Sequence, residues 1–399
     1  MRDVARSVEP VPLPAATLRD VGREWTRIGC IGFGGPPAHI ALLRRLCVER
    51  HGWLRPQEFE DAIAATNLLP GPGSTQLAIL CAWRAAGVRG ALIGGAGFVL
   101  PGLIAILLLS VVFLAAAPPT WIRGAGAGAG AAVAAVAVHA GAGLLKPGWG
   151  RVRGARRGRW IAYVLAGLVA AATVGPWLVA VLLGSGLAEL AWRRRHRPGG
   201  SGFALAVNGW PLFATAAAAT GGLGALAWVA FKVGALAYGG GFVIIPLMQG
   251  DAVDQYHWMT DGQFLNAVAL GQVTPGPVVH TVAAVGYAAA GIGGGLLAAA
   301  VAFAPSFTFI LIGADRFDRL RMNTGVRAFL DGAGPAAIGA IVGSALPLTL
   351  ALSEGWQYVL LGFAAVALFA LRRGVVFTLV AAGAIGAGLA LAGTALPVS

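Results

Sequence analysis

Two glycine and proline triplets in this chain have the chemistry to hold an anion. Pro70-Gly71-Pro72 and Pro275-Gly276-Pro277 each precede an apolar run that we expect to be helical. The first N–H groups of a helix lack partners within the helix, and the aligned peptide dipoles place about half a positive charge there. Glycine lets a ligand approach closely, and proline suits the first turn because its missing N–H is no loss. Both triplets therefore predict an oxyanion-binding helix end.

The triplets belong to a longer motif that occurs twice with the same spacing. Phe33-Gly34-Gly35 precedes the first triplet and Tyr238-Gly239-Gly240 the second, and residues 33–72 overlay residues 238–277 without a gap. A single GG or PGP is more often a tight turn. Two copies in register instead indicate a duplicated chain with paired breaks in membrane helices, and a transport site where the repeats meet. The matching positions are Gly34, Gly35, Leu42, Val48, Trp53, Phe59, Ala62, Ala64 and the whole triplet.

Charged and polar side chains near these motifs are candidates for contacts with the anion. Lys232 and Arg27 each stand six residues before the aromatic of a GG motif. Lys232 lies in an otherwise apolar segment, where an unpaired ammonium costs at least about a few kcal/mol. Snorkelling to an interface is the alternative for Lys232, and a cytoplasmic position for Arg27. The residues predicted to bind substrate are Gly34, Gly35, Gly71, Pro72, Gln76, Gly239, Gly240, Gly276, Pro277, Lys232, Arg27, Gln272 and Thr274.

Four titratable residues are candidates for proton transfer or coupling: His39, His280, Glu49 and Asp254. A lone histidine in a membrane helix is often a packing residue, and this alternative stays open for both histidines. The two acids occupy matching places in the repeats, and Asp251 adds a third acid one turn away. They could end a solvated helix, pair with nearby arginines, or form a cation site.

Composition indicates a membrane protein. The chain is 57% hydrophobic and 11% charged, with 61 Gly among 399 residues, whereas charged residues make up about 25% of soluble domains. The formal net charge of +13 falls in short clusters beside apolar runs, as in cytoplasmic loops, and this distribution argues against a nucleic-acid partner. The cysteines (Cys30, Cys47, Cys81) are too widely spaced for a CxxC metal or redox site.

The elements that must position these residues are membrane helices. A full crossing needs about 20 apolar residues. Shorter segments of mixed polarity follow the GG motifs at 36–50, 56–69, 242–254 and 261–274, and are predicted to be half-membrane or amphipathic helices. The predicted fold class is an all-α integral membrane protein of two inverted repeats with discontinuous helices at the GG and PGP motifs. Crossings are predicted at 91–117, 124–145, 292–313, 329–351, 356–371 and 374–396, with a hairpin at 160–192.

Lysine and arginine set the expected orientation. Basic segments at 145–160, 193–202 and 314–328 are predicted to be cytoplasmic, and the nearly uncharged turn at 118–123 to lie outside. Since this turn matches the basic segment 314–328 of the second repeat, the repeats must be inverted, with one extra crossing at 203–221 between them. A parallel duplication with 203–221 at the interface is the alternative.

The chain divides accordingly into four parts. Residues 1–16 lack a continuous apolar core and are predicted to be a cytoplasmic tail rather than a signal peptide. Residues 17–193 form the first repeat, 194–221 the basic loop and linker crossing, and 222–399 the second repeat.

These motifs resemble the chromate transporter family, in its long form with two homologous halves. The residues that carry the resemblance are Phe33-Gly34-Gly35-Pro36, Ala38-His39-Ile40, Pro70-Gly71-Pro72 with Gln76, Gly239-Gly240-Gly241, Pro246, Trp258, Phe264, Gly271-Gln272, Pro275-Gly276-Pro277 and Gly286-Tyr287. The resemblance implies export of chromate across the bacterial inner membrane, giving chromate resistance, with sulfate as a close chemical relative. The halves differ, because Gly241 stands where the first repeat has Pro36 and Ile244 where it has His39, so a ligand site need not be symmetric.

The expected partners are a chromate or sulfate oxyanion and the lipid bilayer, with a homodimer as a further option; no cofactor, metal or catalytic residue is expected. The GxxxxGK[ST] motif is absent, so a secondary carrier using alternating access is predicted, coupled to protons or to a counter-anion. The alternatives are a carrier of another anion such as sulfate, a channel or partner subunit, and a membrane enzyme acting on a lipid or isoprenoid phosphate. The enzyme would need clustered acids, which only Asp251, Asp254 and Asp261 approach, and HExxH and GxSxG are absent.

Overall fold

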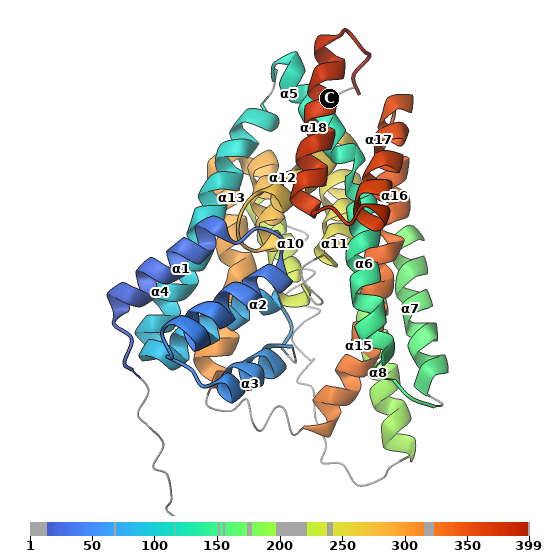
Figure 1. Ribbon diagram of the computed structural model, residues 1–399. Coiled ribbons are helices and arrows are strands. Elements are labelled where there is room, and N and C mark those ends of the chain that lie inside the picture. Colours follow the sequence, from blue (N-terminus) through green and yellow to red (C-terminus); the bar gives the residue numbers. More distant parts are fainter. Residues whose placement is uncertain are drawn as a thin grey trace, which may run out of the picture.

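The structure is a computed structural model in which helices form all the regular elements of the described residues (Figure 1). It describes residues 14–67, 69–115, 117–150, 152–154, 156–173, 178–196, 222–237, 242–314 and 323–397. The predicted linker crossing at 203–221 and Gly239-Gly240 lie outside these ranges.

The helices follow the same order in both halves. The first half contains α1 (Leu18–Ile31), α2 (Pro36–Arg44) continued by η1 (Arg45–Arg50), α3 (Pro56–Thr66), α4 (Gly73–Phe113), α5 (Thr120–Ala131), α6 (Val133–Gly150), α7 (Arg156–Thr173) and α8 (Leu178–His196). The second contains α10 (Gly222–Leu236), α11 (Ile244–Gln249) continued by η3 (Gly250–Gln255), α12 (Asp261–Val273), η4 (Val278–His280), α13 (Thr281–Gly313), α15 (Thr324–Gly343), α16 (Ala345–Leu350), α17 (Gly355–Ala365) continued by η6 (Val366–Ala370), and α18 (Val375–Leu391).

The predicted breaks separate helices where the structure describes them. Gly35, with φ 72°, joins α1 to α2, and each PGP triplet precedes a new helix, at Gly73 in the first half and at Val278 in the second. Pro72 and Pro277 stand just before the first helical residue rather than within the first turn. Their fixed φ still directs the chain into the helix.

Helices α4 and α13 are each broken a second time, which the sequence did not predict. Gly87 has φ 66° and ψ −159°, and Gly291 has φ 63° and ψ −157°, a conformation that glycine adopts readily. A methyl group on Gly90 would lie 2.5 Å from the carbonyl oxygen of Ala82, so the chain folds back on itself there. Each PGP triplet therefore opens a short helix, 73–85 or 278–289, that packs against the longer helix following it.

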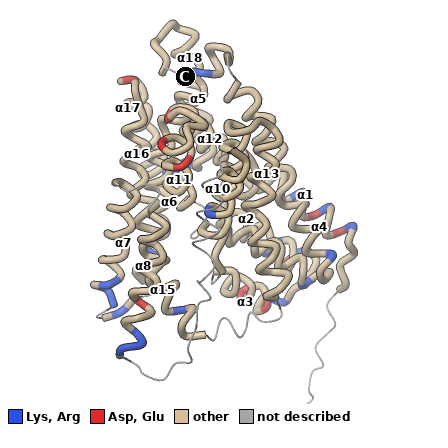
Figure 2. Tube along the Cα trace, turned by 180° about the vertical axis from the view of Figure 1, so that it is seen from behind, with Lys and Arg blue, Asp and Glu red and all other residues tan. Residues whose placement is uncertain are grey.

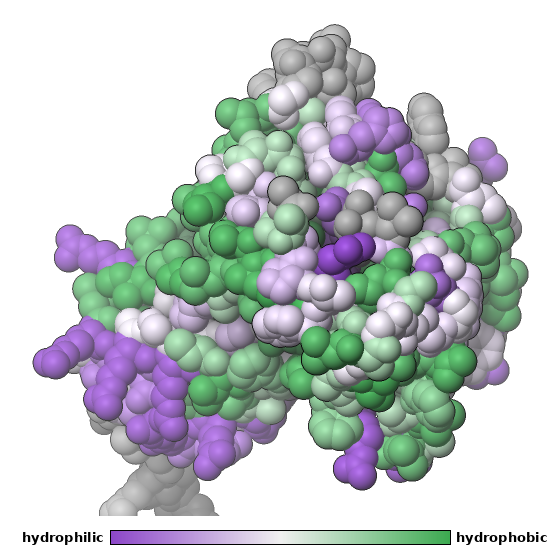
Figure 3. Space-filling view, turned by 90° about the horizontal axis from the view of Figure 1, so that it is seen from above, coloured by the Kyte–Doolittle hydropathy of each residue, from purple (hydrophilic) through white to green (hydrophobic). Residues whose placement is uncertain are grey.

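The outer surface suits a bilayer. Among the described residues, four helical stretches are long and apolar enough to cross a membrane: Gly73–Phe113, Thr120–Gly150, Val278–Gly313 and Thr324–Leu350. Large apolar side chains on several helices face outward, including Leu108, Leu350 and Phe363, each more than 60% exposed. Seen from the end where the chain terminates, the visible flanks are largely hydrophobic, and hydrophilic residues gather mainly at one corner (Figure 3). The protein is a multi-pass membrane protein.

The two halves run in opposite directions. Helix α5 begins at the end of the molecule that holds α18, whereas its counterpart α15 begins at the opposite end, and α3 and α12 lie toward opposite ends as well (Figure 1). The halves also exchange partners, since α5 packs on α18 while α15 packs on α7 and α8. Lys and Arg concentrate toward the end that holds α3 and the start of α15 (Figure 2). The positive-inside rule predicts that this end is cytoplasmic.

Close approach of α7 to α15 depends on glycine. A methyl group on Gly167 would overlap the carbonyl group of Ala336, and one on Gly339 would overlap that of Val164. We predict that Gly167→Ala and Gly339→Ala each lower the free energy of unfolding by about 1–3 kcal/mol through overpacking. The matched control is Gly388→Ala in α18, where the added methyl meets open space. Thermal midpoints in detergent check this, and equal midpoints for all three variants would contradict it.

The inverted arrangement also predicts labelling from opposite sides. In a background lacking the native cysteines, Pro119→Cys before α5 and Thr324→Cys at the start of α15 should react with an impermeant thiol reagent from opposite faces of the membrane. Thr324→Cys should react from the cytoplasmic face. Reaction of both from one face would contradict the inversion.

Candidate functional site

The first PGP turn lies inside the molecule, against the other half of the chain. Gly71 has φ 118°, a conformation that other residues rarely adopt. A methyl group on Gly71 would lie 2.6 Å from Nε2 of Gln76, 3.1 Å from the carbonyl oxygen of Gly234 in α10 and 3.5 Å from Oγ of Ser306 in α13. Both the backbone angle and the lack of space therefore require glycine.

Backbone donors are available at this turn. The N–H groups of Thr75 and Gln76 donate to the carbonyl oxygen of Pro72, as the first bonds of α4. The N–H groups before them are those that a helix leaves without an internal partner. Among the described residues Gly71 N–H has no backbone acceptor. The side chain of Gln76 holds the turn, because its Nε2 donates to the carbonyl oxygen of Pro70 at 2.7 Å.

A cavity of ≈ 830 Å³ leads to this turn. One wall carries Asn67, Gly71 and Gly73 from the end of α3 and the start of α4. The opposite wall, built from α6, α7, α8 and α15, includes three arginines: Arg156, Arg193 and Arg327. Neither Arg156 nor Arg327 forms an ion pair with the acids that the structure describes. Asp331 also lines this wall and pairs with Arg193. The net positive charge of the wall therefore comes from Arg156 and Arg327, and it faces the partial positive charge of the helix end.

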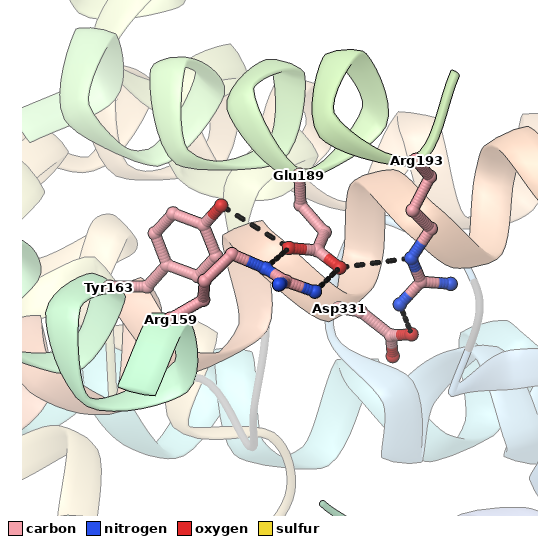
Figure 4. Close-up of polar contacts among 5 residues, drawn as sticks. All are labelled: Arg159, Tyr163, Glu189, Arg193 and Asp331. Carbon is pink, nitrogen blue, oxygen red and sulfur yellow. Dashed lines mark hydrogen bonds and ion pairs between the residues drawn. The ribbon is translucent and has the colours of Figure 1, made fainter. Parts of the chain in front are cut away.

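The arginine wall is fixed by a network of charged groups (Figure 4). Glu189 of α8 accepts hydrogen bonds from Nε of Arg159 at 2.8 Å, from Nε of Arg193 at 2.9 Å and from the hydroxyl of Tyr163 at 3.3 Å. Arg193 also pairs with Asp331 of α15. Because α8 belongs to the first half and α15 to the second, this network joins the halves at the cavity.

The second PGP turn is enclosed differently. Gly276 has φ 89°, and its N–H donates to the carbonyl oxygen of Gly32, at the end of α1, at 2.9 Å. A methyl group on Gly276 would lie 3.1 Å from Cε1 of His280 and 3.6 Å from the carbonyl oxygen of Phe98. His280 is fully buried, with its ring edge-on to Phe303. Protein groups therefore fill the space beside this turn.

The predicted charged contacts lie elsewhere. The ammonium of Lys232 pairs with Oδ2 of Asp251 at 2.6 Å, and both side chains are buried. The side chain of Arg27 is 60% exposed and lies 3.8 Å from Glu24. Glu49 lies 4.0 Å from Arg44, as the alternative of pairing with a nearby arginine predicts, and Asp254 is exposed.

The remaining residues predicted to bind substrate or to transfer protons do not lie together at one site. Nε2 of buried His39 lies 2.9 Å from the carbonyl oxygen of Gly32, which also accepts from Gly276. Gln272 is buried and its Nε2 has no partner among the described residues, whereas the hydroxyl of Thr274 donates to Leu270. A methyl group on Gly35 would meet open space. The structure thus places Gly71, Pro72 and Gln76 beside the cavity, and Gly276, Pro277, His39 and His280 at the second, filled turn.

Comparisons with known proteins agree on one family. Residues 19–190 and 224–388 match the family model described as chromate transporter. A chromate transport protein of Cupriavidus metallidurans is 33% identical over 344 residues, 84% of this chain and 83% of that protein. A chromate transport protein of Pseudomonas aeruginosa is 30% identical over 87% of this chain and 85% of its own length. A probable chromate transport protein of Synechococcus elongatus is 29% identical over 84% of this chain and 85% of its own length. No solved structure matches the chain.

The buried ion pair gives a test of the role of Lys232. The ammonium of Lys232 is held by the carboxylate of Asp251 at 2.6 Å, and what α10 presents to Gly71 is the carbonyl oxygen of Gly234. We predict that Lys232→Met lowers the free energy of unfolding by about 3–5 kcal/mol, because it leaves the carboxylate of Asp251 buried without a partner. The double variant Lys232→Met/Asp251→Leu should recover most of this loss and retain transport. A stable double variant without transport would instead make Lys232 a substrate ligand.

Proposed function

Because this chain belongs to the chromate transporter family, we propose that it is a secondary carrier that exports chromate across the bacterial inner membrane and thereby gives chromate resistance. Three relatives that align with more than four fifths of the chain carry chromate transport in their names. The names of these relatives and the basic residues of the cavity support chromate as the substrate, and export is our proposal.

The observation that carries the proposal is the basic cavity ending at the first PGP turn. Chromate is a tetrahedral dianion, and the helix end offers it backbone N–H donors and a partial positive charge without a fully buried cation. Arg156 and Arg327, which form no ion pair with the described acids, raise the local concentration of anions on the approach to that end. Gly71, Pro72 and Gln76 form the proposed binding turn.

Alternating access follows from the inverted halves. The cavity at the basic end measures ≈ 830 Å³, whereas the pocket beside Arg123, Asn266 and Gln357 toward the opposite end measures ≈ 50 Å³. Arg123 of α5 and Arg327 of α15 occupy matching places in their helices. We interpret this difference in volume as a cytoplasm-open state, in which an exchange of roles between the halves would open the other side.

Export of a dianion needs little additional energy. Moving one elementary charge across 100 mV is worth about 2.3 kcal/mol, so a dianion leaving a cell that is negative inside gains about twice that amount. If protons are coupled as well, His39 and His280 are better placed than Glu49 and Asp254, because both histidines are buried beside the second PGP turn.

Sulfate is the second candidate substrate, since it is also a tetrahedral dianion and the same donors would hold it. A lipid-phosphate enzyme has less support from the site. The carboxylate of Asp251 forms an ion pair with Lys232, and Asp254 and Asp261 are exposed. These three acids do not form the clustered arrangement that such chemistry needs.

Counterflow in vesicles tests the proposed activity. Purified protein should exchange external labelled chromate for internal unlabelled chromate, with sulfate and molybdate as competitors. Gly71→Ala should abolish exchange in a folded, inserted protein, because its Cβ would meet Gln76 and force the turn out of its conformation. Gly388→Ala is the matched control and should exchange at the wild-type rate. Wild-type vesicles without exchange of any of the three anions would refute the carrier.

A further inference from the structure

We propose that the hydroxyl groups of Thr75 and Ser306 bind the oxyanion at the first PGP turn, so that both halves of the chain hold one substrate in a single, asymmetric site. The inference rests on the proposed transport of a tetrahedral oxyanion and names side chains that would select it. Neither hydroxyl belongs to the substrate ligands predicted from the sequence.

Both hydroxyls are buried without a partner. Thr75 and Ser306 are fully buried, and neither Oγ1 of Thr75 nor Oγ of Ser306 has a hydrogen-bond partner among the residues that the structure describes. A buried polar group left unsatisfied is expensive, so native structures rarely keep one without a reason. By contrast, six other buried hydroxyls among the described residues donate to a carbonyl three or four residues earlier, namely those of Thr66, Ser110, Thr274, Thr281, Ser344 and Thr378.

The two groups belong to the same site. Oγ of Ser306 would lie 3.5 Å from a methyl group on Gly71, so it faces the turn across the boundary between the halves. Thr75 lies in the first turn of the helix that the triplet opens. One turn further on, Ile79 packs beside Gly95 together with Phe307, the residue after Ser306. The helix turns that carry Thr75 and Ser306 thus belong to the region where α4 packs against α13.

The donors match what an anion requires. The backbone at Gly71 and Gly73 lines the cavity and offers N–H groups. A hydroxyl without an acceptor can turn its hydrogen toward a ligand oxygen. Neutral donors of this kind, converging from two sides, bind a fully ionised oxyanion such as chromate or sulfate.

The second PGP turn differs in its hydroxyl groups and its backbone donor, although His280 there is also fully buried and neither of its ring nitrogens has a hydrogen-bond partner among the described residues. Ser306 follows Pro305 in α13, and its counterpart after Pro101 in α4 is Gly102. A methyl group on Gly102 would overlap the carbonyl oxygen of Pro275 and lie 2.6 Å from Cε1 of His280, so no hydroxyl fits there. His280 stands at the position of the second motif that matches Thr75 in the first. The N–H group of Gly276 already donates to the carbonyl oxygen of Gly32. The duplicated motif therefore forms one ligand site and one protein-filled contact.

Removal of single hydroxyls tests the proposal. The variants are Ser306→Ala, Thr75→Val and Thr75→Ser, with Ser110→Ala as the control, because Ser110 is equally buried in α4 but donates to Ile106. Two quantities are measured: the chromate concentration that gives half-maximal counterflow, and the chromate concentration that gives half-maximal thermal stabilisation. Both measurements are repeated with sulfate. Ser306→Ala and Thr75→Val should each raise both concentrations about tenfold or more, the effect of one hydrogen bond to a charged group. Thr75→Ser and Ser110→Ala should stay within about twofold of wild type.

Several outcomes separate the proposal from the transport function. In one outcome, the wild-type protein exchanges chromate while Ser306→Ala and Thr75→Val leave both half-maximal concentrations unchanged. That result would overturn the hydroxyl site but not the carrier function. If the wild-type protein neither exchanges any of the probe anions nor is stabilised by them, both the hydroxyl site and the carrier function are refuted. If Ser306→Ala does not fold, the contrast between Thr75→Val and Thr75→Ser decides, since Val keeps the shape of Thr without the hydroxyl and Ser keeps the hydroxyl without the methyl group.

Discussion

The structure depends on one constraint: each PGP triplet starts a helix inside the protein, against the other half of the chain. In a bilayer the unpaired N–H groups of a helix start must find partners within the protein or in a ligand. Gly71 meets that requirement beside Gly234 and Ser306 of the second half, and Gly276 beside Gly32 and Phe98 of the first. The broken helices, the inverted halves and the exchange of packing partners all serve to bring these two helix starts into the interior.

The duplication has kept the same kind of helix start in both halves, but different groups lie beside it. At the second turn the protein supplies the acceptor, Gly32, and the filler, His280. At the first turn the counterpart positions carry small hydroxyl side chains, and a basic cavity leads to them. A site made from both halves suits a carrier, because relative movement of the halves would change the ligand's contacts. The Glu189–Arg193–Asp331 network, which also joins the halves, lies on the opposite cavity wall and would respond to the same movement.

Much of this could be predicted from the sequence. The helices, their order, and the helix starts after the PGP triplets followed from apolar length and from glycine and proline chemistry. The breaks at Gly87 and Gly291 were missed because these glycines are two among many, and only the structure shows a positive φ there. The pairing of Lys232 with Asp251 needed the packing of α10 on η3. Ser306 lies far from Gly71 in the chain and outside the duplicated motif. The sequence feature that could have indicated it is a proline common to both halves, which is followed by Gly102 in the first half and by Ser306 in the second.

The central claim is that one substrate anion sits at the first PGP turn, held by both halves. The most direct measurement is a structure with chromate bound, in which chromium is located by its anomalous scattering. The account predicts a single strong peak beside Gly71 and Gly73, with chromate oxygens within hydrogen-bonding distance of Oγ of Ser306 and Oγ1 of Thr75. A peak beside Gly276, or only among Arg156, Arg193 and Arg327 with the first turn empty, would contradict it.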